Sequence, residues 1–245
     1  MAVLALVLLM PGARAADLKV AAAANLQRVM TQALIPAFEK KTSATVTPTF
    51  GSTKLLAMQV QNGAPVDVFL SADTATTDQL AAQGFVVPAS RRVYALGRLV
   101  MWTRYDAAHH PRRLQDLVDP AYAHIAIANP TLAPYGLAAQ QAFAKAGLTA
   151  RLASRLVTAE NIGQALQYAQ TGNADVALTA LSLVIEDKTN PYILVPDSLY
   201  APLAQSVALV KGSTQPQLAQ RFIAFLTGSE ATPIWRRYGY VLPGK

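Results

Sequence analysis

Cysteine is absent from this chain of 245 residues, and charged residues make up only 14% of it. The lack of cysteine excludes disulfide bonds, thiol catalysis and cysteine-ligated metal sites. Histidine is scarce too: the adjacent pair His109 and His110 precedes Pro111 in a polar stretch, which favours a solvated loop over a metal site, and His124 is the third. A hydrophobic content of 52% indicates a well-buried globular protein and argues against disorder.

The motifs of several enzyme classes are also missing. The sequence contains no G-x-S-x-G nucleophile elbow, no phosphate-binding lysine loop and no HExxH zinc motif. Asp67 and Asp73 lie at the two ends of one apolar stretch, and one carboxylate at each end is not an acid–base pair. An exported enzyme stays an alternative, although no base beside a nucleophile can be named for it.

Long apolar runs are missing except at the start, and that one is too short to span a bilayer. The opening MAVLALVLLMPGARA closes with Ala13-Arg14-Ala15, a small-x-small cleavage pattern. We therefore predict that residues 1–16 are a signal peptide, that cleavage occurs near Ala15 or Ala16, and that the mature chain is exported. With a leader at this end and no DNA-binding segment, a regulatory effector domain is disfavoured.

The net charge of +7 would suit nucleic acid, an anionic membrane or an anionic solute as partner. The basic residues are scattered, and their densest clusters are the pairs Arg91-Arg92, Arg112-Arg113 and Arg236-Arg237. Because none of these is interleaved with aromatic residues, we expect no nucleic acid partner.

Strand and helix signals alternate along the chain, which predicts an α/β protein with parallel strands. Pro36 is expected to kink or tighten the first helix, and Pro48 to place the second strand at a sheet edge. Strands are predicted at 18–24, 44–50, 66–73, 91–96, 98–103, 124–129, 174–180 and 205–212, and helices at 26–38, 53–63, 134–147, 150–156, 161–172, 216–228 and 230–239.

This order predicts two α/β lobes with mainly parallel sheets. Lobe I comprises residues 17–95 and 205–245, and lobe II comprises residues 96–204, because the chain crosses near Ala95 and returns near Gln205. A ligand of such a fold binds in the cleft, outside the carboxyl ends of the strands.

Four predicted strand-to-helix turns carry small, amide or hydroxyl residues. A helix N-terminus offers free N–H groups and a positive dipole end, so turns directed into one cleft would bind an anion. The alternative is that these side chains are ordinary helix caps, as Ser, Thr and Asn often are. The turns contain Asn25, Gly51-Ser52-Thr53, Pro134-Tyr135 and Asn161-Ile162-Gly163.

Several stretches resemble the periplasmic molybdate-binding proteins of ABC transporters. They are AAAANL, FGST followed by QVQNGAPVDVFLSAD, ANPTLAPYGLAA, ENIGQAL and YGYVLP, which together extend from about Leu18 to Pro243. The resemblance implies the type II periplasmic binding fold, with two lobes on a hinge. It also implies a tetrahedral oxyanion held by backbone N–H groups and neutral side chains, with no cofactor and no direct metal ligand.

Carried over by position, the resemblance implies which residues contact molybdate. They are Asn25, Thr53 with Ser52 beside it, Tyr135, and Ile162 through its backbone N–H, with Ala24 and Pro134 as neighbouring candidates.

Two positions depart from the pattern of the family. Some members place a tyrosine at the position of Ala180, and here Tyr135 is expected to supply that hydroxyl. Lys54 stands where a small residue is usual. It either points away along its helix, the interpretation that we favour, or adds a charge near the anion.

The resemblance thus implies a periplasmic, monomeric receptor that captures molybdate, and tungstate as well, for the permease of an ABC importer. The rival within the binding class is a receptor for sulfate or another tetrahedral oxyanion. Phosphate is disfavoured because its proton would need an acceptor, and the candidate contacts include no carboxylate.

Overall fold

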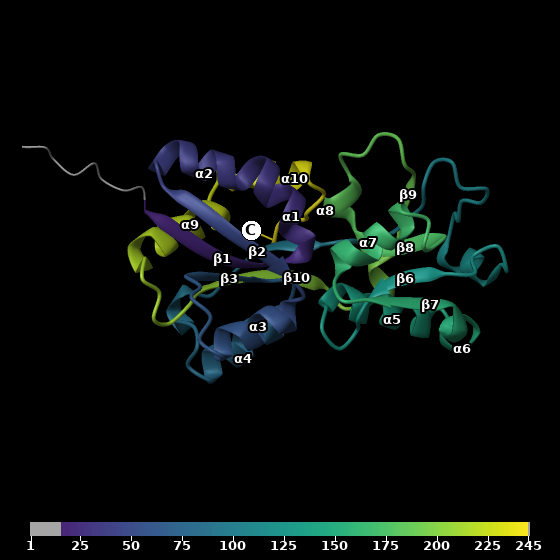
Figure 1. The fold of residues 1–245 in the computed structure, drawn as a ribbon, viewed down its shortest axis with the longest axis horizontal. Coiled ribbons are helices and arrows are strands. Elements are labelled where there is room, and N and C mark those ends of the chain that lie inside the picture. Colours follow the sequence, from purple (N-terminus) through teal and green to yellow (C-terminus); the bar gives the residue numbers. More distant parts are fainter. Residues whose placement is uncertain (1–15, 245) are drawn as a thin grey trace, which may run out of the picture.

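The computed structural model describes residues 16–244 and shows two α/β lobes side by side (Figure 1). Residues 1–15, which hold nearly all of the predicted signal peptide, lie outside the described part. Each lobe contains one five-stranded sheet with helices on both faces. Within residues 16–244, no helix has the length and apolar character that crossing a membrane requires.

The first sheet has the strand order β2-β1-β3-β10-β4. Strand β1 runs parallel to β2 and β3, whereas β10 is antiparallel to β3 and β4. Pro48 lies in β2, at the edge of the sheet as predicted. An edge strand tolerates a proline, because one of its sides forms no hydrogen bonds to a neighbouring strand. The strands are β1 (Asp17–Ala23), β2 (Thr45–Gly51), β3 (Val68–Ser71), β4 (Arg92–Gly97) and β10 (Leu203–Leu209).

The second sheet has the order β7-β6-β8-β5-β9. Strand β6 is parallel to β7 and β8, and β5 is antiparallel to β8 and β9. Both sheets are mixed but mainly parallel: in each, one strand, β10 or β5, runs against the other four, because it enters directly from the other lobe without a crossover helix. The strands are β5 (Leu99–Trp102), β6 (Ile125–Ala128), β7 (Leu156–Ala159), β8 (Val176–Ala180) and β9 (Tyr192–Leu194).

Helices bury both faces of the first sheet. On one face Phe38 and Phe222 pack edge to face, and on the other Leu56 and Leu80 pack against Phe69. The first face is covered by α1 (Gln27–Val29), α2 (Ile35–Thr42), α9 (Pro216–Thr227) and α10 (Ala231–Arg237), and the second by α3 (Thr53–Gln61) and α4 (Ala75–Ala82) (Figure 1).

The second lobe is layered in the same way (Figure 1). Helix α7 lies on one face of its sheet, and α5 and α6 lie on the other. Its helices are α5 (Pro134–Lys145), α6 (Thr149–Leu152), α7 (Ile162–Gln170) and α8 (Leu181–Val184).

Some local predictions were wrong. Of the two expectations for Pro36, tightening is wrong, whereas the kink stays a prediction: a wider π-helical turn, Met30–Leu34, precedes Pro36 and accommodates a residue that lacks an N–H and crowds the preceding turn. The helix expected at 150–156 ends early, and Leu156 opens β7, because this short apolar segment completes the sheet edge. Strand β9 and helix α4 were not anticipated.

The two crossings between the lobes are short. Only Arg98 separates β4 in the first sheet from β5 in the second, and residues 195–202 connect β9 back to β10. Strand pairing places Leu96, Gly97, Leu203 and Ala204 with the first sheet, within two residues of the lobe boundaries expected from the sequence. The division into 17–95, 96–204 and 205–245 itself stays a prediction.

Candidate functional site

A small cavity lies between the lobes, where β1 and β2 end and where α3, α5 and α7 begin. All seven candidate contact residues line it, so the structure brings the four predicted turns together. The lining consists of Ala23, Ala24, Asn25, Gly51, Ser52, Thr53, Ala72, Ala133, Pro134, Tyr135, Asn161 and Ile162, none of them charged.

Backbone N–H groups at three helix starts border this cavity. The first N–H groups of a helix have no partner inside it. Those of Thr53, Tyr135 and Ile162 donate to no other group among residues 16–244. Asn161 caps α7 by accepting from the N–H groups of Gly163 and Gln164, both at 3.0 Å, and this leaves the Ile162 N–H for a ligand.

The side chain of Asn25 does not cap a helix, contrary to the interpretation as an N-cap. Asn25 lies inside a 3-10 turn, Ala24–Leu26, that has no side-chain cap. Its Nδ2 donates to Gln205 Oε1 at 2.8 Å and to Tyr240 Oη at 2.9 Å. Both side-chain donors of Asn25 are thus used inside the first lobe, and the buried Oδ1 has no partner among the described residues.

Ser52 and Thr53 also lack cap bonds, although they begin helix α3. The Ser52 hydroxyl donates across the cleft to the carbonyl oxygen of Glu160. Thr53 Oγ1 accepts from the N–H of Ala72 at 3.2 Å, so its hydroxyl hydrogen remains available to a ligand. Thr53 is 1% exposed, so its side chain is withdrawn from bulk water.

The hydroxyl of Tyr135 is buried, and no described residue hydrogen-bonds it. Burial, followed by the nearby Tyr240, raises the pKa of Tyr135 well above its ordinary value, and the Asn25 side chain beside the hydroxyl only partly opposes this rise. The hydroxyl therefore keeps its proton at neutral pH and can act as a donor.

Lys54 does not line the cavity. Its side chain is exposed, and its backbone N–H donates to the carbonyl oxygen of Leu132 at 3.1 Å across the cleft. This placement agrees with the interpretation that its ammonium group points away. Ala180, where some family members have tyrosine, is the last residue of β8 and is fully buried.

Two further hydrogen bonds join the lobes. Arg28 Nη1 donates to the Leu183 carbonyl oxygen at 2.8 Å, and Ser182 Oγ donates to the Asn25 carbonyl oxygen at 2.8 Å. With the bond from Ser52 to Glu160, these contacts hold both lobes around the cavity. The structure is thus in a closed form.

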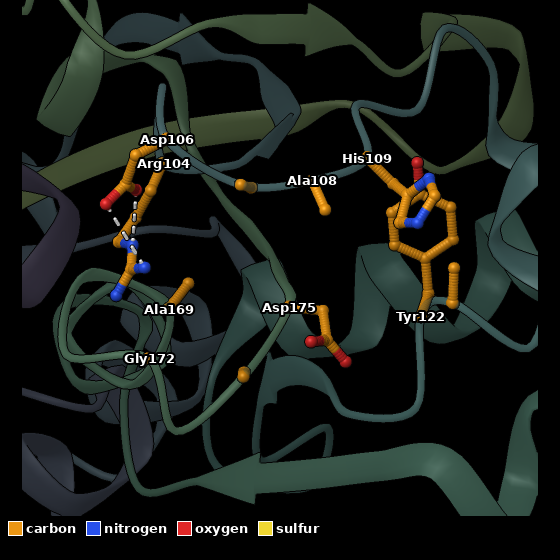
Figure 2. Close-up of a pocket in the computed structure, with 11 residues that line it drawn as sticks. Arg104, Asp106, Ala108, His109, Tyr122, Ala169, Gly172 and Asp175 are labelled. Atoms are coloured by element: carbon orange, nitrogen blue, oxygen red, sulfur yellow. Dashed lines mark hydrogen bonds and ion pairs between the residues drawn. The ribbon is translucent and has the colours of Figure 1, made fainter.

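A second pocket, of about 250 Å³, lies in the second lobe and shares no lining residue with the cleft cavity (Figure 2). The Asp175 carboxylate points into its open centre, and Arg104 Nε is paired with Asp106 Oδ1 at 2.8 Å (Figure 2). Asp106 and Asp175 bring two carboxylates to this pocket, and Arg104 is already paired with one of them, so the pocket disfavours binding of an anion. Among residues 16–244, no group of three or more His, Asp or Glu side chains could hold a metal ion.

Sequence reasoning did not identify Gln205 and Tyr240 as part of the site. Both are buried and orient Asn25 from β10 and the C-terminal segment. Tyr240 lies within YGYVLP, one of the stretches that carried the resemblance, whereas no pattern marked Gln205.

Residues 18–241 match the family model described as bacterial extracellular solute-binding protein. A molybdate-binding protein ModA of Azotobacter vinelandii is 41% identical over 96% of this chain and 94% of its own, and that of Rhodobacter capsulatus is 39% identical over 83% and 80%. A solved structure of the Azotobacter vinelandii periplasmic molybdate-binding protein superposes with a TM-score of 0.86 at 34% identity, covering 93% of this chain and all of that one.

A solved sulfate-binding protein, SubI of Mycobacterium tuberculosis, superposes with a TM-score of 0.78 at 17% identity, covering 92% of this chain and 86% of that one, and so shares the fold. These findings confirm the predicted two-lobed periplasmic binding fold. The chain therefore belongs to the bacterial extracellular solute-binding protein family, and relatives named as molybdate-binding proteins match it along nearly its whole length.

Proposed function

We propose that this protein captures molybdate in the cleft cavity and delivers it to an ABC importer. The observation that carries the proposal is an uncharged, buried cavity at which three long helices begin and present unpartnered N–H groups. Such N–H groups and helix dipoles stabilise an anion without a countercharge. The relatives named as molybdate-binding proteins support the choice of anion. The protein binds its ligand and is not an enzyme.

The molybdate contacts in this proposal are the backbone N–H groups of Thr53, Tyr135 and Ile162 and the hydroxyls of Thr53 and Tyr135. The side chain of Asn25 is not a contact in this proposal, since both of its donors are occupied. Asn25 contributes its backbone N–H and the shape of the turn. Ser52 contributes chiefly by joining the lobes, and Ala24 and Pro134 contribute wall surface.

Ligand binding is proposed to favour the closed form. Thr53 lies in the first lobe, and Tyr135 and Ile162 lie in the second, so an anion that contacts all three binds the closed form more tightly. The importer permease would then recognise this closed form. We also propose that the protein acts as a monomer in the periplasm after loss of residues 1–16 and that it accepts tungstate, a tetrahedral dianion like molybdate.

The test is thermal unfolding with molybdate, tungstate, sulfate and phosphate. A ligand at about 100 times its Kd stabilises the folded state by about 2.7 kcal/mol, which raises Tm by roughly 5–10 °C for a chain of this size. We expect this shift with molybdate and tungstate and none with phosphate, which needs an acceptor for its proton. A larger shift with sulfate than with molybdate would instead identify the protein as a sulfate receptor.

Molybdate affinity is expected to depend little on salt. The proposed contacts are buried and neutral, and screening acts mainly on exposed charges. Titration calorimetry at low and physiological ionic strength should give similar Kd values for the wild type and for Lys54→Gln. A steep salt dependence that Lys54→Gln abolishes would make the Lys54 ammonium group a ligand.

A further inference from the structure

Gly97 is the last residue of β4, directly before the chain crosses into the second lobe. Its backbone is not in the left-handed region, so its conformation does not require glycine. The space around Gly97, in contrast, does require glycine. A Cβ at this position would overlap the hydroxyl oxygen of Tyr135 and would lie 3.0 Å from its Cζ and 3.1 Å from Gln205 Nε2.

The two residues belong to different lobes. Tyr135 is the second residue of α5 in the second lobe, and its hydroxyl reaches a notch formed by Gly97, Gln205 and Asn25 of the first lobe. The Gln205 side chain is held in place, because its Nε2 donates to the carbonyl oxygens of Ala72 and Leu203. Two polar atoms in this notch, Tyr135 Oη and Asn25 Oδ1, are buried without a partner among the described residues.

We propose that Gly97 is a positioning residue for ligand binding: its missing side chain leaves the notch that seats the Tyr135 hydroxyl at the cavity when the lobes close. This inference rests on the proposed function, since its main readout is molybdate affinity. A side chain at position 97 would keep the ring out of the notch. Tyr135 also carries a backbone N–H group that borders the cavity. Displacing its ring would therefore also disturb the contact between that N–H group and the anion.

Other glycines of the site do not couple the two lobes in this way. A Cβ at Gly136 would overlap the backbone carbonyl of Ala128, which lies in the same lobe, so that glycine serves packing within the lobe. A Cβ at Gly51 would make an ordinary contact with Leu56 at 3.4 Å. Gly51 also lines the cavity and is therefore a matched control.

The test is a double-mutant cycle with Gly97→Ala and Tyr135→Phe, titrated with molybdate. Gly97→Ala is expected to weaken binding roughly 5- to 150-fold in the wild type, the range for overpacking a filled site. In the Tyr135→Phe background, where the overlapping oxygen is gone, the same substitution should weaken binding by less than about threefold, a sign of direct coupling. Gly51→Ala should have the same effect in both backgrounds.

Equal losses from Gly97→Ala in both backgrounds would overturn the inference. A wild-type protein that does not bind molybdate would refute the proposed function instead, so the two failures are distinguishable. If Gly97→Ala is too unstable to titrate, the amount of folded protein and its unfolding temperature are compared with those of the double variant. Recovery in the double variant supports the notch, and no recovery overturns it.

Discussion

Thr53→Asp is expected to weaken molybdate binding at least about a thousandfold. Thr53 is buried at the first turn of α3 and lines the cavity, so a carboxylate there would face the dianion at short range. Two like unit charges about 4 Å apart at an effective dielectric constant of about 20 repel by about 4 kcal/mol, so one unit of the dianion's charge alone accounts for roughly a thousandfold in Kd, and the second unit adds to this loss. Titration calorimetry with molybdate measures this loss.

The matched control is Thr53→Asn, which is close in size and stays neutral. An aspartate in the first turn of a helix is favoured by the helix dipole, so we expect Thr53→Asp to fold. Thr53→Asn should lose far less affinity than Thr53→Asp, and their unfolding temperatures without ligand should be compared. Similar affinities for the two variants would place the anion away from Thr53 and contradict the proposed site.

Tyr135→Phe is expected to weaken molybdate binding by roughly 10- to 150-fold, because a hydrogen bond to a charged group contributes about 1.5–3 kcal/mol. The hydroxyl is buried and has no partner among the described residues, so its removal breaks no protein–protein bond. The ring still packs, and the unfolding temperature without ligand should change little. Removal of an unsatisfied polar group can even raise it.

Tyr135→Phe also separates two roles of this residue. Its backbone N–H remains in the variant, so the loss of affinity reports the hydroxyl alone. Wild-type affinity would mean that the ring is a packing residue and that only the N–H of Tyr135 contacts the anion. Loss of affinity for molybdate and sulfate by the same factor would show that the hydroxyl does not select between them.

Much of this protein follows from its sequence, because the patterns that determine it are local. Helical periodicity after Pro134 predicted α5, and Pro48 predicted an edge strand, since each depends on a few neighbouring residues. The four turns with small and hydroxyl residues predicted most of the residues that line the cavity, but not Ala23, Ala72 or Ala133. The resemblance predicted a family that the comparisons confirm.

Tertiary structure alone decided how those residues are used. Asn25 looks like a cap in the sequence, yet Gln205 and Tyr240, 180 and 215 residues away, take both of its side-chain donors. In the sequence, Gly97 only separates two predicted strands. The notch for Tyr135 is visible only from the packing across the lobes. Hydrogen-bond partners and free space depend on contacts between distant segments, and periodicity and turn chemistry carry no information about such contacts.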